Sequence, residues 1–260
     1  MIRRSCRLAL VALGIPVLAG AQPPAVASGV YRWADLPQTR VGDRIVRRVL
    51  AGPTTDLAAL LVEATTLPTA AARDSLVASN DAEVLVIVRD GRLRVTMGGA
   101  TTTVGPGSVV LREPRERVQL ASADRGGVTY YVLTYFAKAA PDADRGASHG
   151  GSTVVDWNAS PPAPTEVGTR RQPLDRPTTM FGRLEMHVST VNHGLTNHPV
   201  HTHRAEEFVL MRHGDVRMVI GDTRQTASVG DLIFLASNVP HSLDNIGDGV
   251  AEYFAFQGVP

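Results

Sequence analysis

The stretch NHPVHTHRAEEFVLMRHG, residues 197–214, holds four of the eight histidines of a chain in which 20% of the residues are charged. His201 and His203 stand two residues apart, and Glu207 follows four residues later. Alternate residues of an extended strand leave the same face, so we expect these three side chains to lie together. His241 follows a proline in the later stretch NVPHSLDN. If the strand that leads to it pairs back across a sheet, three imidazoles and one carboxylate converge.

Neutral imidazole and carboxylate ligands suit one divalent transition metal, such as Mn, Fe, Ni, Zn or Cu. Four protein ligands on a six-coordinate ion leave about two positions open for water, oxygen or a substrate. Five further side chains are candidates for the rim or the pocket of this site, although ordinary loop or core positions would also account for them: His187, His198, Val209, Met211 and Leu243.

The elements around these residues recur along the chain. Trp33 in YRWADLP aligns with Trp157 in VVDWNASP, at an offset of about 124 residues (157 minus 33). The PTT triplets at 53–55 and 177–179 match, as do AEVLVIVRDG and AEEFVLMRHG. Such repetition in order indicates two copies of one structural unit. The segment AKAAPDADRGASHGGS between the copies, rich in Ala, Gly, Asp and Ser, is typical of a linker.

Short β-rich runs separated by turn residues predict strands in each copy. EVLVIVRDGRLRVTM contains two such runs around Asp90-Gly91, which is a strong hairpin signal because both residues tolerate positive φ. TDLAALLVEA is the best helical candidate, but its counterpart MFGRLEMHVSTV alternates like a strand. The chain is therefore predicted to be all-β, with two barrels or sandwiches in tandem.

The histidine cluster resembles the paired motifs of the cupin superfamily. The first motif falls on Gly194, His201, His203, Glu207 and Gly214, with one extra residue before the histidines. The second motif falls on Gly230, Ala236, Asn238, His241 and Asn245, where Ala replaces the usual proline and Asn the usual glycine. The resemblance implies two tandem cupin (double-stranded β-helix, jelly-roll) barrels, as in bicupins. It also implies that His201, His203, Glu207 and His241 bind the metal.

The first copy is an internal control for this assignment. With Gly91 aligned on Gly214, the four ligand positions fall on residues that cannot bind a metal: Ala78, Asn80, Val84 and Val118. Glu83 aligns with Glu206, whose carboxylate should leave the opposite face of the strand. We expect an N-terminal barrel without metal, which packs against its twin or forms a homodimer, or instead holds an organic ligand.

The first residues have the features of a secretory signal peptide. Residues 1–21 combine an arginine-rich start, an apolar run from Leu8 to Leu18 and small residues before a cleavage site near Ala21. Cleavage would remove the single cysteine, Cys6, and three arginines, leaving 23 basic residues (26 minus 3) against 25 acidic ones. This balance does not support binding to nucleic acid or to anionic membranes, and no later segment predicts a stable membrane span.

The predicted organisation is a signal peptide (1–21), an N-terminal barrel without metal ligands (30–137), a linker (138–152) and a metal-binding C-terminal barrel (153–260). We expect a periplasmic or secreted protein with a small-molecule substrate or ligand. Oxygen-dependent, dioxygenase-type chemistry is the leading hypothesis. A metal-assisted hydrolase or isomerase similar to ureidoglycine aminohydrolase, and a binding protein without turnover, stay open as alternatives.

Overall fold

The computed structural model describes residues 24–76 and 82–259. The predicted signal peptide with its cleavage site, and the aligned positions Ala78 and Asn80, lie outside the described residues. Within the described part of the chain, no helix has both the length and the apolar character needed to cross a bilayer.

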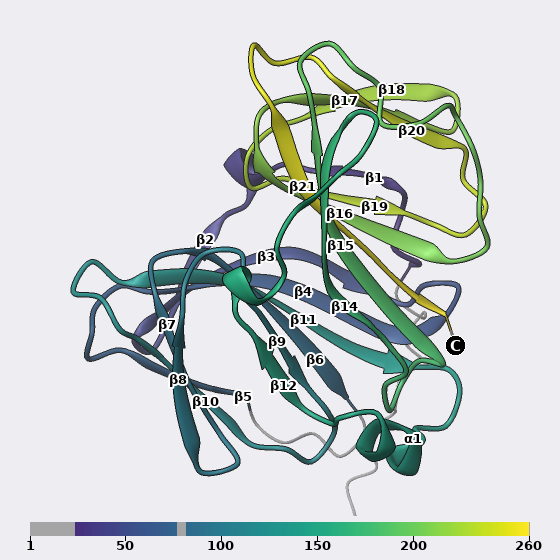
Figure 1. The fold of residues 1–260 in the computed structure, drawn as a ribbon. Coiled ribbons are helices and arrows are strands. Elements are labelled where there is room, and N and C mark those ends of the chain that lie inside the picture. Colours follow the sequence, from purple (N-terminus) through teal and green to yellow (C-terminus); the bar gives the residue numbers. More distant parts are fainter. Residues whose placement is uncertain (1–23, 77–81, 260) are drawn as a thin grey trace, which may run out of the picture.

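Each half of the chain forms a barrel from one seven-stranded and one smaller antiparallel sheet (Figure 1). The N-terminal strands are β2 (Gln38–Val41), β3 (Arg44–Gly52), β4 (Leu57–Leu67), β5 (Arg73–Leu76), β6 (Glu83–Asp90), β7 (Leu93–Met97), β8 (Ala100–Val104), β9 (Val109–Arg112), β10 (Val118–Ser122) and β11 (Val128–Ala137). The C-terminal strands are β13 (Ala163–Pro164), β14 (Gly168–Arg176), β15 (Arg183–Val191), β16 (Glu206–His213), β17 (Val216–Ile220), β18 (Thr223–Ala227), β19 (Leu232–Leu235), β20 (His241–Asn245) and β21 (Ala251–Val259). The prediction of two tandem jelly-roll barrels is confirmed.

Two more strands, β1 (Gly29–Tyr31) and β12 (Thr153–Val155), complete the large sheets. The large sheets have equivalent strand orders, β12-β9-β6-β11-β4-β3-β2 and β1-β19-β16-β21-β15-β14-β13, and the smaller sheets are β5-β10-β7-β8 and β18-β17-β20. The segment considered as a helix, TDLAALLVEA, lies almost entirely in strand β4, which pairs with β3 and β11. Its buried residues Leu57, Leu60, Val62 and Ala64 all join one core, and a register shift against β11 between Leu57 and Ala59 breaks their alternation. Helix α1 (Ala143–Ser148) lies within the predicted linker.

The two halves exchange their first strands. β1 (Gly29–Tyr31) pairs with β19 of the C-terminal barrel, and β12 (Thr153–Val155) pairs with β9 of the N-terminal barrel. Figure 1 shows β1 in purple beside the green and yellow strands of the C-terminal barrel. Backbone hydrogen bonds thus join the two barrels. The predicted boundaries of the barrels, 30–137 and 153–260, do not include this exchange of strands.

The repeated tryptophans follow these exchanged strands, in the short helices η1 (Trp33–Asp35) and η2 (Trp157–Ala159). The Trp33 ring is contacted by the guanidinium groups of Arg47, at 4.6 Å, and Arg89, at 3.7 Å. The Trp157 ring is contacted in the same way by Arg171, at 4.1 Å, and Arg212, at 4.0 Å. These cation–π contacts, equivalent in the two copies, hold each exchanged segment against both barrels.

The PTT triplets are also explained by the contact between the barrels. The Glu206 carboxylate accepts hydrogen bonds from the Thr54 hydroxyl at 2.5 Å and the Thr55 backbone N–H at 2.6 Å. Its counterpart Glu83 accepts a hydrogen bond from the Met180 backbone N–H at 3.2 Å, in the second PTT turn. Each barrel therefore supplies a buried glutamate to the turn of the other, and Glu206 has a structural role outside the metal cluster.

The described residues form three apolar cores. One is shared by the outer faces of the two seven-stranded sheets and includes Leu60, Val62, Met186, Phe254 and Phe256. The other two lie one inside each barrel. Because burial of each large apolar side chain contributes about 1.5–3 kcal/mol, the shared core makes the two barrels one stable body.

Candidate metal centre

Three histidines meet at one end of the C-terminal barrel. The potential ligand nitrogens of His201, His203 and His241 all lie within 4.8 Å of one another. Ring centroids are 4.4 Å apart for His201 and His241, 4.9 Å for His203 and His241, and 5.4 Å for His201 and His203. This arrangement could bind a metal ion.

The backbone brings these histidines together through a single isolated bridge. The N–H of His201 donates to the carbonyl of His241 at 3.1 Å, and the reciprocal bond is 3.0 Å long. The N–H of Asn238 donates to the carbonyl of His203 at 2.9 Å, and Asn238 has a φ of 61°. Strand periodicity predicted His201 and His203 on a strand continuous with Glu207, but β16 begins only at Glu206. The segment before it bends because it must bridge to β20.

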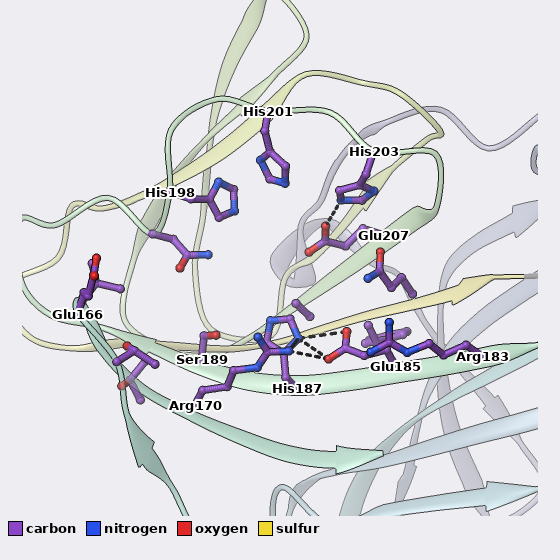
Figure 2. Close-up of a pocket in the computed structure, with 17 residues that line it drawn as sticks. Glu166, Arg170, Arg183, Glu185, His187, Ser189, His198, His201, His203 and Glu207 are labelled. Carbon is purple, nitrogen blue, oxygen red and sulfur yellow. Dashed lines mark hydrogen bonds and ion pairs between the residues drawn. The ribbon is translucent and has the colours of Figure 1, made fainter. Parts of the chain in front are cut away.

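Glu207 lies beside two of the histidines. Its Oε2 atom is 2.9 Å from His203 Nε2, a contact drawn in Figure 2. The same atom is 3.3 Å from His241 Nε2. Burial by itself would raise the pKa of Glu207, but the hydrogen bond with His203 and the close approach and charges of His241 and His203 lower this pKa to about 2. The carboxylate is therefore ionised at neutral pH and could complete a set of three nitrogens and one oxygen.

The hydrogen bonds of the rings suit a cation. Nδ1 of His203 lies 2.8 Å from the carbonyl of Ala205, and Nδ1 of His241 lies 2.8 Å from the carbonyl of Val239. A carbonyl only accepts, so in the neutral rings both Nδ1 atoms carry the proton and both Nε2 atoms present lone pairs. Nε2 of His241 is buried and has no hydrogen-bond partner. Two nitrogen lone pairs and a carboxylate that face one point are stable together when a metal ion or a proton lies between them.

The rings of His201 and His203 have different electrostatic surroundings. Burial, and then the neighbouring histidines His198, His241 and His203, lower the pKa of His201. The hydrogen bond with Glu207 raises the pKa of His203. Neutral imidazole is the form that binds a metal, so His201 is prepared for coordination, whereas His203 must lose a shared proton when a cation binds.

A cavity of about 500 Å³ opens beside the cluster. His201, His203 and Glu207 line one side of it, and the candidates His187 and His198 line it as well. The other three candidates, Val209, Met211 and Leu243, are nearly fully buried in the core of the C-terminal barrel and do not line this cavity. These three side chains point into the same barrel interior as the metal-binding residues, but they lie deeper, where neighbouring side chains fill the space.

The opposite wall of the cavity is polar and comes from β14 and β15. Arg170, Glu185 and His187 line it, and the Nη2 atom of Arg170 lies 2.8 Å from a Glu185 oxygen. No sequence motif singles out Arg170 or Glu185. Arg170 precedes the histidine motif by about 30 residues, and only the pairing of β14 with β15 brings it to the site.

The N-terminal barrel differs at the equivalent place. Strand pairing sets Leu76 opposite Val118, as the isolated bridge sets His201 opposite His241. Leu76 therefore occupies the position equivalent to His201. Among residues 24–76 and 82–259, the N-terminal barrel contains no group of three or more His, Cys, Asp or Glu residues whose potential ligand atoms lie close together.

Comparisons with known proteins agree with this architecture. Residues 187–256 match the family described as Cupin domain, and residues 78–167 match the family described as AraC-like ligand binding domain. No curated protein sequence matches the chain.

Several solved structures share the fold. The oxalate decarboxylase formate complex of Lactobacillus farciminis is 13% identical, with 92% of this chain and 88% of that chain covered and a TM-score of 0.69. AerE from Microcystis aeruginosa is 9% identical, with 86% and 97% covered and a TM-score of 0.67. A glyoxylate-induced protein from Pseudomonas aeruginosa is 12% identical, with 92% and 94% covered and a TM-score of 0.67. At these identities the likeness concerns the fold.

Proposed function

We propose that the chain is a bicupin of the cupin superfamily, and that it is an exported, metal-dependent enzyme that acts on a small molecule in its C-terminal barrel. The ligands would be His201, His203, Glu207 and His241. The observation that carries the proposal is the buried, unpartnered Nε2 of His241, which faces the Glu207 carboxylate at 3.3 Å.

The leading reaction class is oxygen-dependent cleavage of an enolic or aromatic compound. A bound Mn, Fe, Ni, Zn or Cu ion would supply Lewis acidity and, for the redox-active metals, a site for oxygen. Four protein ligands leave about two positions for exogenous groups, and the cavity of about 500 Å³ is in the range of small-molecule sites. Export, as proposed from residues 1–21, would deliver the protein to an aerobic compartment.

A metal-assisted hydrolase or isomerase is the second candidate. It is favoured by the pair formed by His187 and Glu185 in the cavity wall, because both reactions need a group that accepts and returns a proton. Binding of a metal or small ligand without turnover is the remaining alternative. The structural likeness to oxalate decarboxylases concerns the fold and does not transfer their reaction to this chain.

The test begins with purification of the mature protein and measurement of its metal content by mass spectrometry. Oxygen uptake is then followed with catechols, flavonols and 1,3-diketones, and protein stripped of metal serves as the control. We expect about one metal ion per chain and oxygen uptake that disappears with the metal. Metal without oxygen uptake would refute the dioxygenase class, and protein that cannot be loaded with any of the five metals would refute the metal centre.

A further inference from the structure

His187 and Glu185 form a hydrogen-bonded pair on the cavity wall opposite the metal centre. Nδ1 of His187 lies 2.9 Å from one Glu185 oxygen and 3.2 Å from the other. The side chain of His187 is 19% exposed and that of Glu185 is 5% exposed. Figure 2 shows the His187 ring rising from β15 toward the space that His201, His203 and Glu207 also face. The pair is thus a buried carboxylate behind an imidazole at the cavity surface.

The surroundings of Glu185 fix the tautomer of this ring. Burial by itself would raise the pKa of Glu185, but hydrogen bonds from His187 and Gln172 and the charges of His187 and Arg170 lower it. Nε2 of Gln172 donates to Glu185 at 2.8 Å, and so does Nη2 of Arg170. An ionised carboxylate can only accept, so in the neutral ring Nδ1 of His187 carries the proton and Nε2 has a free lone pair. Nη2 of Arg170 lies 3.2 Å from the same Nδ1, but two donors form no hydrogen bond, and the shorter contact with Glu185 decides the tautomer.

Comparison of the two barrels links this wall to the metal centre. The equivalent pairings Ile45 with Thr66 and Thr169 with Thr190 align β3 and β4 with β14 and β15. In that register Val46, Leu61 and Glu63 stand where the C-terminal barrel has Arg170, Glu185 and His187. The N-terminal barrel folds the same way without this trio, so the fold does not require it. The trio and the histidine cluster occur in the same barrel and face the same cavity.

We propose that His187 is the proton acceptor of this site, oriented by Glu185, for substrates that lose a hydroxyl or enol proton beside the metal centre. This inference rests on the proposed function and names the substrate class: hydroxyl-bearing aromatic or enolisable carbonyl compounds. In the step, the substrate O–H bond breaks and an N–H bond forms at Nε2 of His187. The imidazolium is stabilised by Glu185, and the oxyanion lies near the Arg170 guanidinium, whose side chain is 46% exposed.

Other charged groups line the same cavity and act on this proton transfer. Apart from the proposed ligands they are Glu166 on the segment before β14, Arg183 on β15 and His198 on the loop that precedes the cluster. Arg183 is paired with Asp175 at 2.6 Å, so its charge is largely neutralised. Arg170 and Glu185 are therefore the charged groups that contact the His187 ring.

The first experiment is nuclear magnetic resonance on the metal-free protein, which tests the pair without the metal. Long-range 1H–15N correlation spectra report the tautomer of each histidine ring, and comparison with the H187Q variant assigns the signals of His187. We expect the Nδ1–H tautomer in the native protein and a shift toward the Nε2–H tautomer in E185Q. A native His187 that already carries its proton on Nε2 would overturn the proposal.

The second experiment uses zinc-loaded protein and 4-nitrocatechol, whose visible absorption changes as its hydroxyl groups lose protons. For H187Q we expect about a tenfold lower ratio of deprotonated to protonated bound probe at equal zinc content, equivalent to one pKa unit of the probe. H193Q is the matched control, because His193 contacts the Gly247 carbonyl outside the cavity. An unchanged ratio in H187Q, or loss of its zinc, would overturn the role of His187. Failure of native protein to bind zinc would instead overturn the metal centre.

Discussion

Glu83 should make this protein less stable as the pH rises. The side chain is fully buried between the two barrels and contacts the Tyr135 hydroxyl and the Met180 backbone N–H. Burial, and then the charge of Glu113, raise the pKa of Glu83 from 4.5 to about 8, although hydrogen bonds from Tyr135, Met180 and Thr178 oppose this rise. At neutral pH the folded protein therefore holds a proton here that the unfolded chain has released.

The sign and size of the effect follow from this difference. The folded state binds more protons than the unfolded state between the two pKa values, 4.5 and about 8, so stability falls throughout that window. Each pH unit well inside the window costs about 1.4 kcal/mol, which gives a loss of about 3 to 4 kcal/mol between pH 5 and pH 8. Below pH 4.5 the carboxyl is neutral in both states and does not change the free energy of unfolding. Above about pH 8 it is ionised in both states, and the free energy of unfolding falls no further.

The substitution E83Q replaces the neutral acid by a neutral amide of similar shape and removes the titration. We expect E83Q to be close to the native protein in stability near pH 5 and more stable by about 3 kcal/mol near pH 8. The assay is urea unfolding of metal-free protein followed by the fluorescence of Trp33 and Trp157, which lie at the contact between the barrels. Chelator is present throughout, so that proton release by metal ligands does not contribute.

The matched comparison is E206Q, at the equivalent position of the other barrel. Glu206 accepts hydrogen bonds from the Thr54 hydroxyl and two backbone N–H groups, and an amide offers only one acceptor oxygen. E206Q should therefore be less stable than the native protein near pH 7, by about 1–3 kcal/mol for a buried group left unsatisfied. A stability difference between E83Q and native protein that does not change with pH would refute the reasoning on Glu83.

Three further outcomes are expected. The H201A variant should lose its metal, as measured by mass spectrometry. Without metal it should unfold at the same urea concentration as native protein, because His201 is exposed and outside the apolar cores. Unfolding of H201A would contradict this. Adding zinc at about 100 times its dissociation constant should stabilise native protein by about 3 kcal/mol, and a melting temperature insensitive to zinc would count against a built site. W33L should lower the free energy of unfolding by about 1–3 kcal/mol through the lost contacts with Arg47 and Arg89, and an effect below about 0.5 kcal/mol would show that these contacts contribute little.

The sequence alone determined the two-barrel, all-β architecture, because alternating strands, glycine turns and a repeat near 124 residues can be recognised in the order of the residues. It also identified His201, His203, Glu207 and His241 as candidate ligands, since the family motifs fix their spacing. It separated Glu83 and Glu206 from the metal cluster, because adjacent residues of a strand face opposite sides.

Only the tertiary structure decided what surrounds these residues. The exchange of β1 and β12 and the shared core depend on which sheet edges and faces are free to pair, and no local signal contains that choice. Arg170 and Glu185 reach the cavity through the register of β14 on β15, between residues about 15 positions apart. The raised pKa of Glu83 arises from burial against a turn almost 100 residues away. Strand periodicity predicts the face from which a side chain leaves, but its neighbours across a sheet or an interface are set by packing of the whole chain.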